Sequence, residues 1–389
     1  MPVDNRMTGP EEKSWLQIEI MRQGEVLRRV LSRQSSSIAE AVSGRLARSP
    51  RDWVATGCGD SLFAGMCAEY WFAEACGTPL RAIHALAFSR YLYRSVDEHS
   101  VVFAVSYSGN TARVVEAAVA AKARGAQVIA ITANGQSRLA KIADWWLVNE
   151  AEGERSNCRT GSFQAACLLF RSFATRLAQT QARDRDGAPG LADPEALPNA
   201  VDALAAACAG PVRAIVDALP DNLTFVYIGG GYGYPVAWYG ASKLYEAATI
   251  AVHTAELEQF VHCDIFPIDR RSCVVMVAPA GPSYARAVEV AGGLRQLGAI
   301  TIGISDDPAF AAHCAHFVGL PGGWDEDAIP FLACIPLQHF ALDWAVRLGQ
   351  NPDLVSNKAV NRPLIERSEQ WTGEDYARRQ AAPAGGGQD

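Results

Sequence analysis

The sequence lacks several features by which whole classes of protein are recognised. It has 10 cysteines, but they form no Cys-x-x-Cys pair, and no histidine stands at the spacing of a zinc site. In such a chain most cysteines act as small buried hydrophobic residues, so we expect neither disulfides nor a bound metal. Lysine and arginine form no runs and the net charge is −7, which argues against nucleic acid as a partner.

Long apolar segments are also missing. No uninterrupted apolar stretch reaches the length of a membrane span, and residues 1–13 are polar, without the apolar core of a signal peptide. We therefore expect a cytoplasmic protein with no membrane partner. A small anionic substrate is compatible with the acidic balance, because local loops rather than net charge capture phosphate groups.

What the sequence does contain is enough apolar material for two cores. The chain has 389 residues, 49% of them hydrophobic, which is enough for two domains of ordinary size. Apolar strand patterns alternate with helical patterns, as in Val101–Val105 followed by the Ala/Val-rich stretch to Arg124. This alternation predicts an α/β fold with parallel sheets flanked by helices. The predicted organisation is a helical segment (1–50), a first domain (51–185), a polar Gly/Pro-containing linker (186–199), a second domain (200–380) and a disordered tail (381–389).

An internal repeat supports two copies of one unit. Trp53–Leu62 aligns without gaps on Phe225–Tyr234, and 101–132 aligns without gaps on 274–305. In this alignment the copies differ in the loop after the second strand. Its three hydroxyl residues are replaced in the second copy, as Ser106, Ser108 and Thr111 face Pro279, Gly281 and Tyr284.

The loop 106–111 has the composition of an anion site. It follows a strand and precedes a helix, whose first turn offers unpaired N–H groups and a partial positive charge. Three hydroxyls add donors, and Gly109 lets a ligand approach the backbone. A single serine or threonine before a helix is more often only an N-cap. Three hydroxyls and a glycine within six residues support a phosphate site about as well as they support simple capping.

These motifs resemble the tandem SIS (sugar isomerase) domain family. Val105–Thr111 resembles its S-x-S-G-x-T phosphate loop, and Val54–Ser61 resembles its first strand and G-x-G-x-S turn. The resemblance extends over most of the chain and implies two tandem SIS domains, each a helix-flanked parallel sheet. It implies a site for the sugar phosphate at Ser61, Ser106, Tyr107, Ser108, Thr111 and Thr160. Asp60 stands where the family usually has threonine, so its carboxylate has to point away from a bound phosphate.

The same resemblance implies acid–base residues in the second domain. Ser242–Glu246 resembles the family's L-K-L-K-E helix end, which assigns the proton-transferring base to Glu246, and His262 matches the ring-opening histidine. Lys358 is an approximate match to the lysine that holds the open-chain sugar, and Glu258 is a possible helper. Without the resemblance, Glu246 and Lys358 would be read as solvated charges and His262 as a core histidine.

The implied activity is aldose–ketose isomerisation or deamination of a phosphorylated (amino) sugar through an enediol or enolamine, without cofactor. The likeness is to the isomerase half of glucosamine-6-phosphate synthase, so we expect no use of glutamine. Two alternatives stay open. One is a deglycase that cleaves a sugar–amine linkage, and the other is a sugar-phosphate sensor without catalysis. The family also implies a homodimer or higher homo-oligomer.

Overall fold

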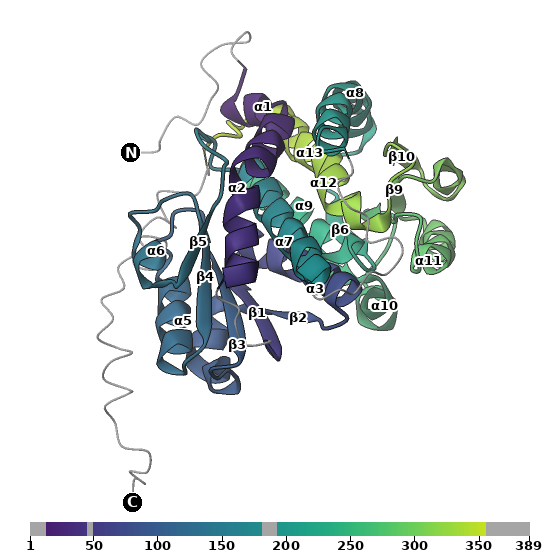
Figure 1. Cartoon of the computed structure of the whole chain (residues 1–389). Coiled ribbons are helices and arrows are strands. Elements are labelled where there is room, and N and C mark those ends of the chain that lie inside the picture. The colour runs from purple at the N-terminus through teal and green to yellow at the C-terminus, as the bar shows by residue number, and fades with distance from the viewer. Residues whose placement is uncertain (1–12, 45–49, 181–192, 355–389) are drawn as a thin grey trace, which may run out of the picture.

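The chain folds around two parallel sheets of five strands each (Figure 1). The computed structural model describes residues 13–44, 50–180 and 193–354. The first sheet has the order β2-β1-β3-β4-β5, formed by β1 (Asp52–Gly57), β2 (Leu80–His84), β3 (Ser100–Val105), β4 (Gln127–Thr132) and β5 (Trp145–Val148). The second has the same order, β7-β6-β8-β9-β10, formed by β6 (Thr224–Gly229), β7 (Val252–Glu256), β8 (Ser272–Val277), β9 (Ile300–Ser305) and β10 (His316–Gly319). The predicted α/β class is confirmed.

The repeat is present in the backbone, but the register of its central strand differs from the predicted one. Trp53 of β1 pairs with Val101 of β3, and Phe225 of β6 pairs with Cys273 of β8. Because Trp53 and Phe225 are equivalent, Val101 corresponds to Cys273 and not to Val274.

The extra residue of the second copy lies in its helix instead. Helix α5 (Ala112–Ala123) has 12 residues and α11 (Tyr284–Gln296) has 13. The loop equivalents therefore shift by one position: Ser106 and Ser108 correspond to Ala278 and Ala280, and Thr111 corresponds to Ser283. The expectation that the second copy has lost all three hydroxyls is wrong at the third position.

Both sheets are covered by helices on their two faces. The longer helices are α2 (Gln23–Gly44), α3 (Asp60–Cys76), α5, α7 (Gly161–Thr180), α8 (Ala196–Ala218), α9 (Gly233–Ala248), α11 and α13 (Cys334–Arg347). The short helical elements are α1 (Trp15–Ile20), α4 (Ala85–Ala87), η1 (Phe88–Leu92), η2 (Tyr93–Ser95), α6 (Arg138–Ile142), α10 (Leu257–Gln259), η3 (Phe260–Asp264), η4 (Pro308–His313), η5 (Glu326–Ala328) and α12 (Ile329–Leu332). Every residue of β3 and β8 is buried, as expected for central strands covered on both faces.

One hydrophobic core joins the two halves of the molecule. Helices α2 and α7 run side by side between the sheets, and α3 of the first half packs against α9 of the second (Figure 1). The core includes Phe103 of β3, Phe170 of α7 and Phe225 of β6, all 2% exposed or less. Shared burial on this scale fixes the two sheets relative to each other.

Two helical segments are apolar and long enough to cross a membrane by length and composition alone, Ala196–Ala218 and Glu326–Arg347. The apolar window of the second is 94% buried and that of the first 39%, and α8 packs against α2 and α13. Core helices pass the same test, so neither segment indicates a membrane span. Helix α8 also includes the last residues of the predicted linker, whose earlier part lies outside the described residues.

The turn between β3 and α5 depends on Gly109. This residue has φ +66°, and a Cβ placed on it would lie 2.1 Å from the Ser137 hydroxyl oxygen and 2.7 Å from that of Thr132. A side chain at this position would therefore strain the backbone and displace both neighbours.

We predict that Gly109→Ala lowers the free energy of unfolding by about 1–3 kcal/mol, because the left-handed conformation and the close contacts both oppose a side chain. Gly292→Ala is the matched control, since nothing lies within 4 Å of the added Cβ in helix α11. That variant should gain roughly 0.5–1 kcal/mol. Denaturant unfolding measures both, and equal stabilities would contradict the prediction.

Candidate active site

The loop Ser106–Thr111 lies beside the turn that follows β1. β1 and β3 are adjacent parallel strands, so Gly57 and Val105 end at the same edge of the first sheet. In open parallel sheets, ligands bind at this carboxyl edge. The two loops that the sequence singled out are therefore neighbours in space.

Hydrogen bonds within the loop hold two hydroxyls together. The Ser106 side chain is buried, its oxygen lies 2.9 Å from that of Thr111, and it accepts the Gly109 N–H at 3.2 Å. The Thr111 side chain makes no capping bond to α5, because its hydroxyl is used by Ser106. The first N–H groups of α5 therefore stay free to bind an anion at the partial positive end of the helix.

A buried lysine joins the two halves of the molecule above this edge. Lys243 of α9 is fully buried, and its ammonium lies 2.7 Å from Asp60 Oδ2 and 2.7 Å from Glu246 Oε2. It also donates to the Arg159 carbonyl at 3.1 Å. The Ser242 hydroxyl donates to the other Asp60 oxygen at 3.1 Å. Asp60 thus points toward α9, as a bound phosphate would require.

The protonation of this cluster follows from burial and charge. Burial raises the pKa of Glu246, Lys243 opposes this shift and Asp60 adds to it, and together they bring the pKa to about 7. Burial alone would lower the pKa of Lys243, but the Asp60 and Glu246 carboxylates outweigh it and raise the pKa above its usual value. A lysine that stays charged beside a carboxyl group titrating near neutrality is suited to proton transfer.

Arg159 connects the lysine cluster to the loop. Its carbonyl accepts from Lys243, and its guanidinium carbon lies 4.4 Å from the centre of the Tyr107 ring. The Tyr107 hydroxyl donates to the Ala151 carbonyl at 2.7 Å, so it is already committed to a partner within the chain. Arg159 thus contacts both the cluster of Lys243, Asp60 and Glu246 and the loop Ser106–Thr111.

Known proteins resemble this chain in sequence and in fold. A model of the SIS domain family matches residues 48–176. The first half of the chain thus contains a SIS domain. A glutamine–fructose-6-phosphate aminotransferase of Pyrococcus horikoshii is 27% identical over 336 residues, covering 84% of this chain and 55% of the relative. The chain thus spans about half the length of the curated relatives it matches.

Two solved structures show the same fold. The C-terminal domain of the glucosamine–fructose-6-phosphate aminotransferase of Francisella tularensis superimposes with a TM-score of 0.78 at 20% identity, covering 88% of this chain and 98% of its own. Tagatose-6-phosphate ketose/aldose isomerase of Escherichia coli gives 0.75 at 19% identity, covering 90% and 97%. The tandem SIS architecture that the sequence predicts is therefore confirmed.

In the second half of the chain, a carboxylate lies at the position equivalent to the two loops. A Cβ on Gly231 would lie 2.8 Å from one Glu326 carboxylate oxygen, and a Cβ on Gly281 would lie 2.4 Å from the other. By register, these glycines correspond to Gly59 and Gly109. The Glu326 carboxylate therefore lies between the two second-half loops, whereas nothing lies within 4 Å of a Cβ placed on Gly59 in the first half.

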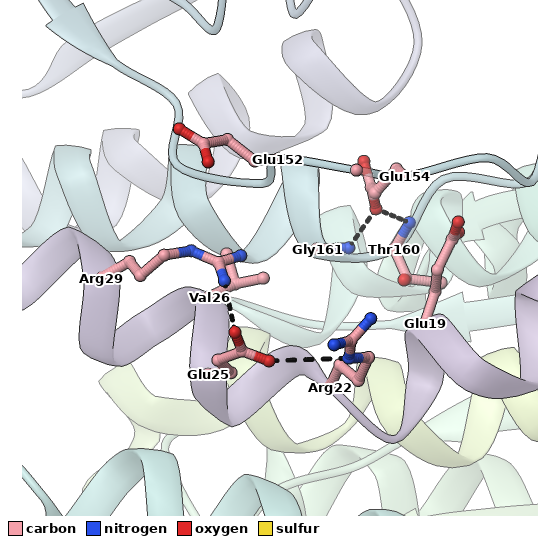
Figure 2. A pocket seen from close by; sticks show the side chains of 10 residues that line it. Glu19, Arg22, Glu25, Val26, Arg29, Glu152, Glu154, Thr160 and Gly161 are labelled. Carbon is pink, nitrogen blue, oxygen red and sulfur yellow. Dashed lines mark hydrogen bonds and ion pairs between the residues drawn. The ribbon is translucent and has the colours of Figure 1, made fainter.

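Two of the remaining predicted site residues, His262 and Thr160, make no hydrogen bond or ion pair with the lysine cluster within the described residues. The His262 side chain is 72% exposed and pairs with Glu258 at 3.2 Å, and no bond joins it to Glu246 or Asp60 within the described residues. The Thr160 hydroxyl is buried in a separate small cavity beside Glu154 (Figure 2). Ser61 follows Asp60 at the start of α3. Lys358 lies outside the described residues.

The sequence analysis did not single out Lys243 or Arg159. Lys243 stands three positions before Glu246 on a helix, so the two share a face, and that spacing could have indicated an ion pair. No signal in the sequence connects Lys243 to Asp60, which lies 183 positions away.

We predict that Lys243→Met lowers the free energy of unfolding by about 3 kcal/mol, because it leaves Asp60 and Glu246 facing each other without a cation. Adding Asp60→Asn should restore part of the loss. Arg271→Met is the control, because its ion pair with Asp269 is exposed to solvent and should contribute little to stability. Equal losses in both single variants, measured by denaturant unfolding, would refute a central role for Lys243.

Proposed function

We propose that this SIS protein is an enzyme that moves a proton between adjacent carbons of a phosphorylated sugar or amino sugar, by isomerisation or deamination. The observation that carries the proposal is the ion-paired Glu246, poised to titrate near neutral pH at the edge where the Ser106–Thr111 loop lies open. An acid–base group next to an anion site is what this chemistry requires.

The loop would anchor the phosphate end of the substrate. The free N–H groups of the α5 N-terminus and the hydroxyls of Ser106, Ser108 and Thr111 supply donors without a lysine. Asp60 would not repel the phosphate, because its carboxylate is held by Lys243 and Ser242. Anchoring one end fixes the reacting carbons relative to Glu246.

Glu246 would act on the open-chain sugar. Its carboxylate takes the proton from the carbon next to the carbonyl or imine, and the double bond shifts to give an enediol or enolamine. Return of the proton to the neighbouring carbon gives the isomer, and addition of water to an imine releases ammonia. The Lys243 ammonium, which donates to Asp60, Glu246 and the Arg159 carbonyl, would hold the Glu246 carboxylate in position.

Ring opening would fall to His262. Because its imidazole is exposed and separate from Glu246 of the same chain, we propose that it serves the site of a second copy in a homo-oligomer. An imidazole can exchange protons with the ring oxygen near neutral pH.

We predict that replacing Ser106, Ser108 and Thr111 together by alanine weakens fructose 6-phosphate binding at least tenfold in calorimetry, because charge-assisted donors are lost. Ser283→Ala is the matched control, since Ser283 is the second-half counterpart of Thr111. It should bind as the wild type does. Unchanged affinity in the triple variant would exclude this loop as the phosphate site.

We predict that turnover rises with pH through about 7, because the base must be ionised to accept a proton and burial raises the pKa of Glu246 to about 7. Glu246→Gln should lower the rate by about 10²–10⁴ and abolish this limb of the profile. Glu289→Gln, whose side chain is 66% exposed, should change neither.

The assay is a panel of sugar phosphates, amino-sugar phosphates and Amadori-type phosphates, with products identified by mass spectrometry. A mass-neutral product supports isomerisation, and released ammonia supports deamination. Release of a larger amine would replace the proposal by a deglycase. Tight binding without turnover of any compound would indicate a sensor instead.

A further inference from the structure

Three charged side chains form a cluster next to the phosphate loop, and the proposed chemistry uses none of them. Arg90 of η1 and Arg113 of α5 both pair with Glu116, which lies one turn further along α5. The Glu116 side chain has no exposed surface, whereas the side chains of Arg113 and Arg90 are 27% and 14% exposed. The carboxylate is therefore enclosed, and both arginine side chains reach the surface.

Arg90 alone is enough to neutralise Glu116. Its guanidinium holds the carboxylate through two nitrogens, with Nε 2.6 Å from Oε1 and Nη2 3.0 Å from Oε2. Two-point contacts of this kind are among the strongest that arginine makes with a carboxylate. Arg113 brings a second positive charge, and neither guanidinium pairs with another carboxylate in residues 13–44, 50–180 and 193–354. Two guanidinium groups and one carboxylate give the cluster a net charge of +1.

Arg113 keeps one edge of its guanidinium free for a ligand. It donates to Glu116 Oε2 through Nη1, and its Nε and Nη2 make no hydrogen bond in the part of the chain that the structure describes. An edge with two N–H groups fits two oxygens of a carboxylate or a phosphate. Partial burial strengthens such a contact, because water screens it less than at an open surface.

The cluster lies at the edge of the sheet where the substrate is expected. Arg113 is the second residue of α5, and Thr111 of the phosphate loop is the N-cap of the same helix. Burial raises the pKa of the Cys58 thiol, and a hydrogen bond with the Ala85 backbone and the charge of Arg113 oppose this shift. Cys58 belongs to the turn that follows β1, so the charge of Arg113 reaches both loops that border the candidate active site.

The second half has the opposite balance of charge at the equivalent place. Strand register makes the segment after β2 equivalent to the segment after β7, and α5 equivalent to α11. There, Arg286 of α11 lies between two carboxylates, Glu258 at 2.7 Å and Glu289 at 2.8 Å. The positive cluster thus belongs to the half that carries the hydroxyl loop, as a role in binding an anionic ligand requires.

We infer that Arg113 binds a second anionic group of the substrate, so that the protein selects sugar phosphates that also carry a carboxylate or a second phosphate. The inference rests on the proposed function, because the loop Ser106–Thr111 would hold the first phosphate. Arg90 keeps Glu116 neutralised, which leaves the Arg113 guanidinium available to the ligand. An anion there would compensate the surplus charge of the cluster, and a neutral hydroxyl group would not.

The test is calorimetry of the full chain with three open-chain ligands that differ only at carbon 1. Glucitol 6-phosphate has a hydroxyl group there, 6-phosphogluconate a carboxylate and glucitol 1,6-bisphosphate a second phosphate. At equal ionic strength, at least one of the two doubly anionic ligands should bind about tenfold more tightly than glucitol 6-phosphate, because hydrogen bonds between charged groups are the strong ones. A gain with 6-phosphogluconate identifies a carboxylate as a suitable second group, and a gain with the bisphosphate alone identifies a phosphate.

Arg113→Gln should abolish this preference and leave the affinity for glucitol 6-phosphate unchanged, because Arg90 still neutralises Glu116 in the variant. Arg113→Lys, which keeps the charge and loses the two-point contact, should retain part of the preference. Lys122→Gln is the matched control and should retain all of it. Lys122 lies near the other end of α5, where its exposed ammonium pairs with Asp144.

Equal affinities of the wild type for all three ligands, or a preference that Arg113→Gln retains, would overturn the inference and leave the proposed function intact. The variant with alanine at Ser106, Ser108 and Thr111 tests the other case. If it keeps the wild-type affinity for glucitol 6-phosphate, the loop is not the phosphate site, and the proposed function fails together with the inference that rests on it. Failure of all three ligands to bind the wild type would also overturn both.

Discussion

The candidate active site depends on one ammonium group buried between two carboxylates. Lys243 belongs to a helix of the second half, and Asp60 begins a helix of the first, so their contact joins the halves at the sheet edge where the phosphate loop lies. Burial would expel the charge of an isolated lysine, and only the paired carboxylates keep it. The same contact orients Asp60 away from the loop and places Glu246 beside a fixed positive charge.

The duplication shows how one architecture gives one open site. Both sheets have the same strand order. In the turns after β1 and β6, Gly59 and Gly231 have nearly the same positive φ angle, 54° and 53°. In the first half, nothing lies within 4 Å of a Cβ placed on Gly59, and the Ser106 and Thr111 hydroxyls are hydrogen-bonded to each other. In the second half, the Glu326 carboxylate lies against Gly231, the counterpart of Gly59. A side chain at an anion site competes with a ligand, which gives a physical reason for function to concentrate in the first half.

Much of the fold could be predicted from the sequence because its signals are local. The buried run Val101–Val105, the following hydroxyl-rich loop and the Ala/Val helix indicate a strand, a turn and a helix without any long-range information. The loop register of the second copy could not be predicted. An alignment without gaps places the extra residue before the loop, whereas the strand pairing places it within α11.

The sequence by itself determined the α/β repeat and the hydroxyl loop, because apolar periodicity and turn residues act over a few positions, and the family resemblance indicated Glu246. Tertiary structure alone decided the partners of the polar groups. It paired Asp60 with Lys243, placed Glu326 between two glycines, and enclosed the Thr160 hydroxyl with Glu19. The physical reason is that a buried polar atom must bond to whatever long-range packing brings near it, and that neighbour stands far away in the chain.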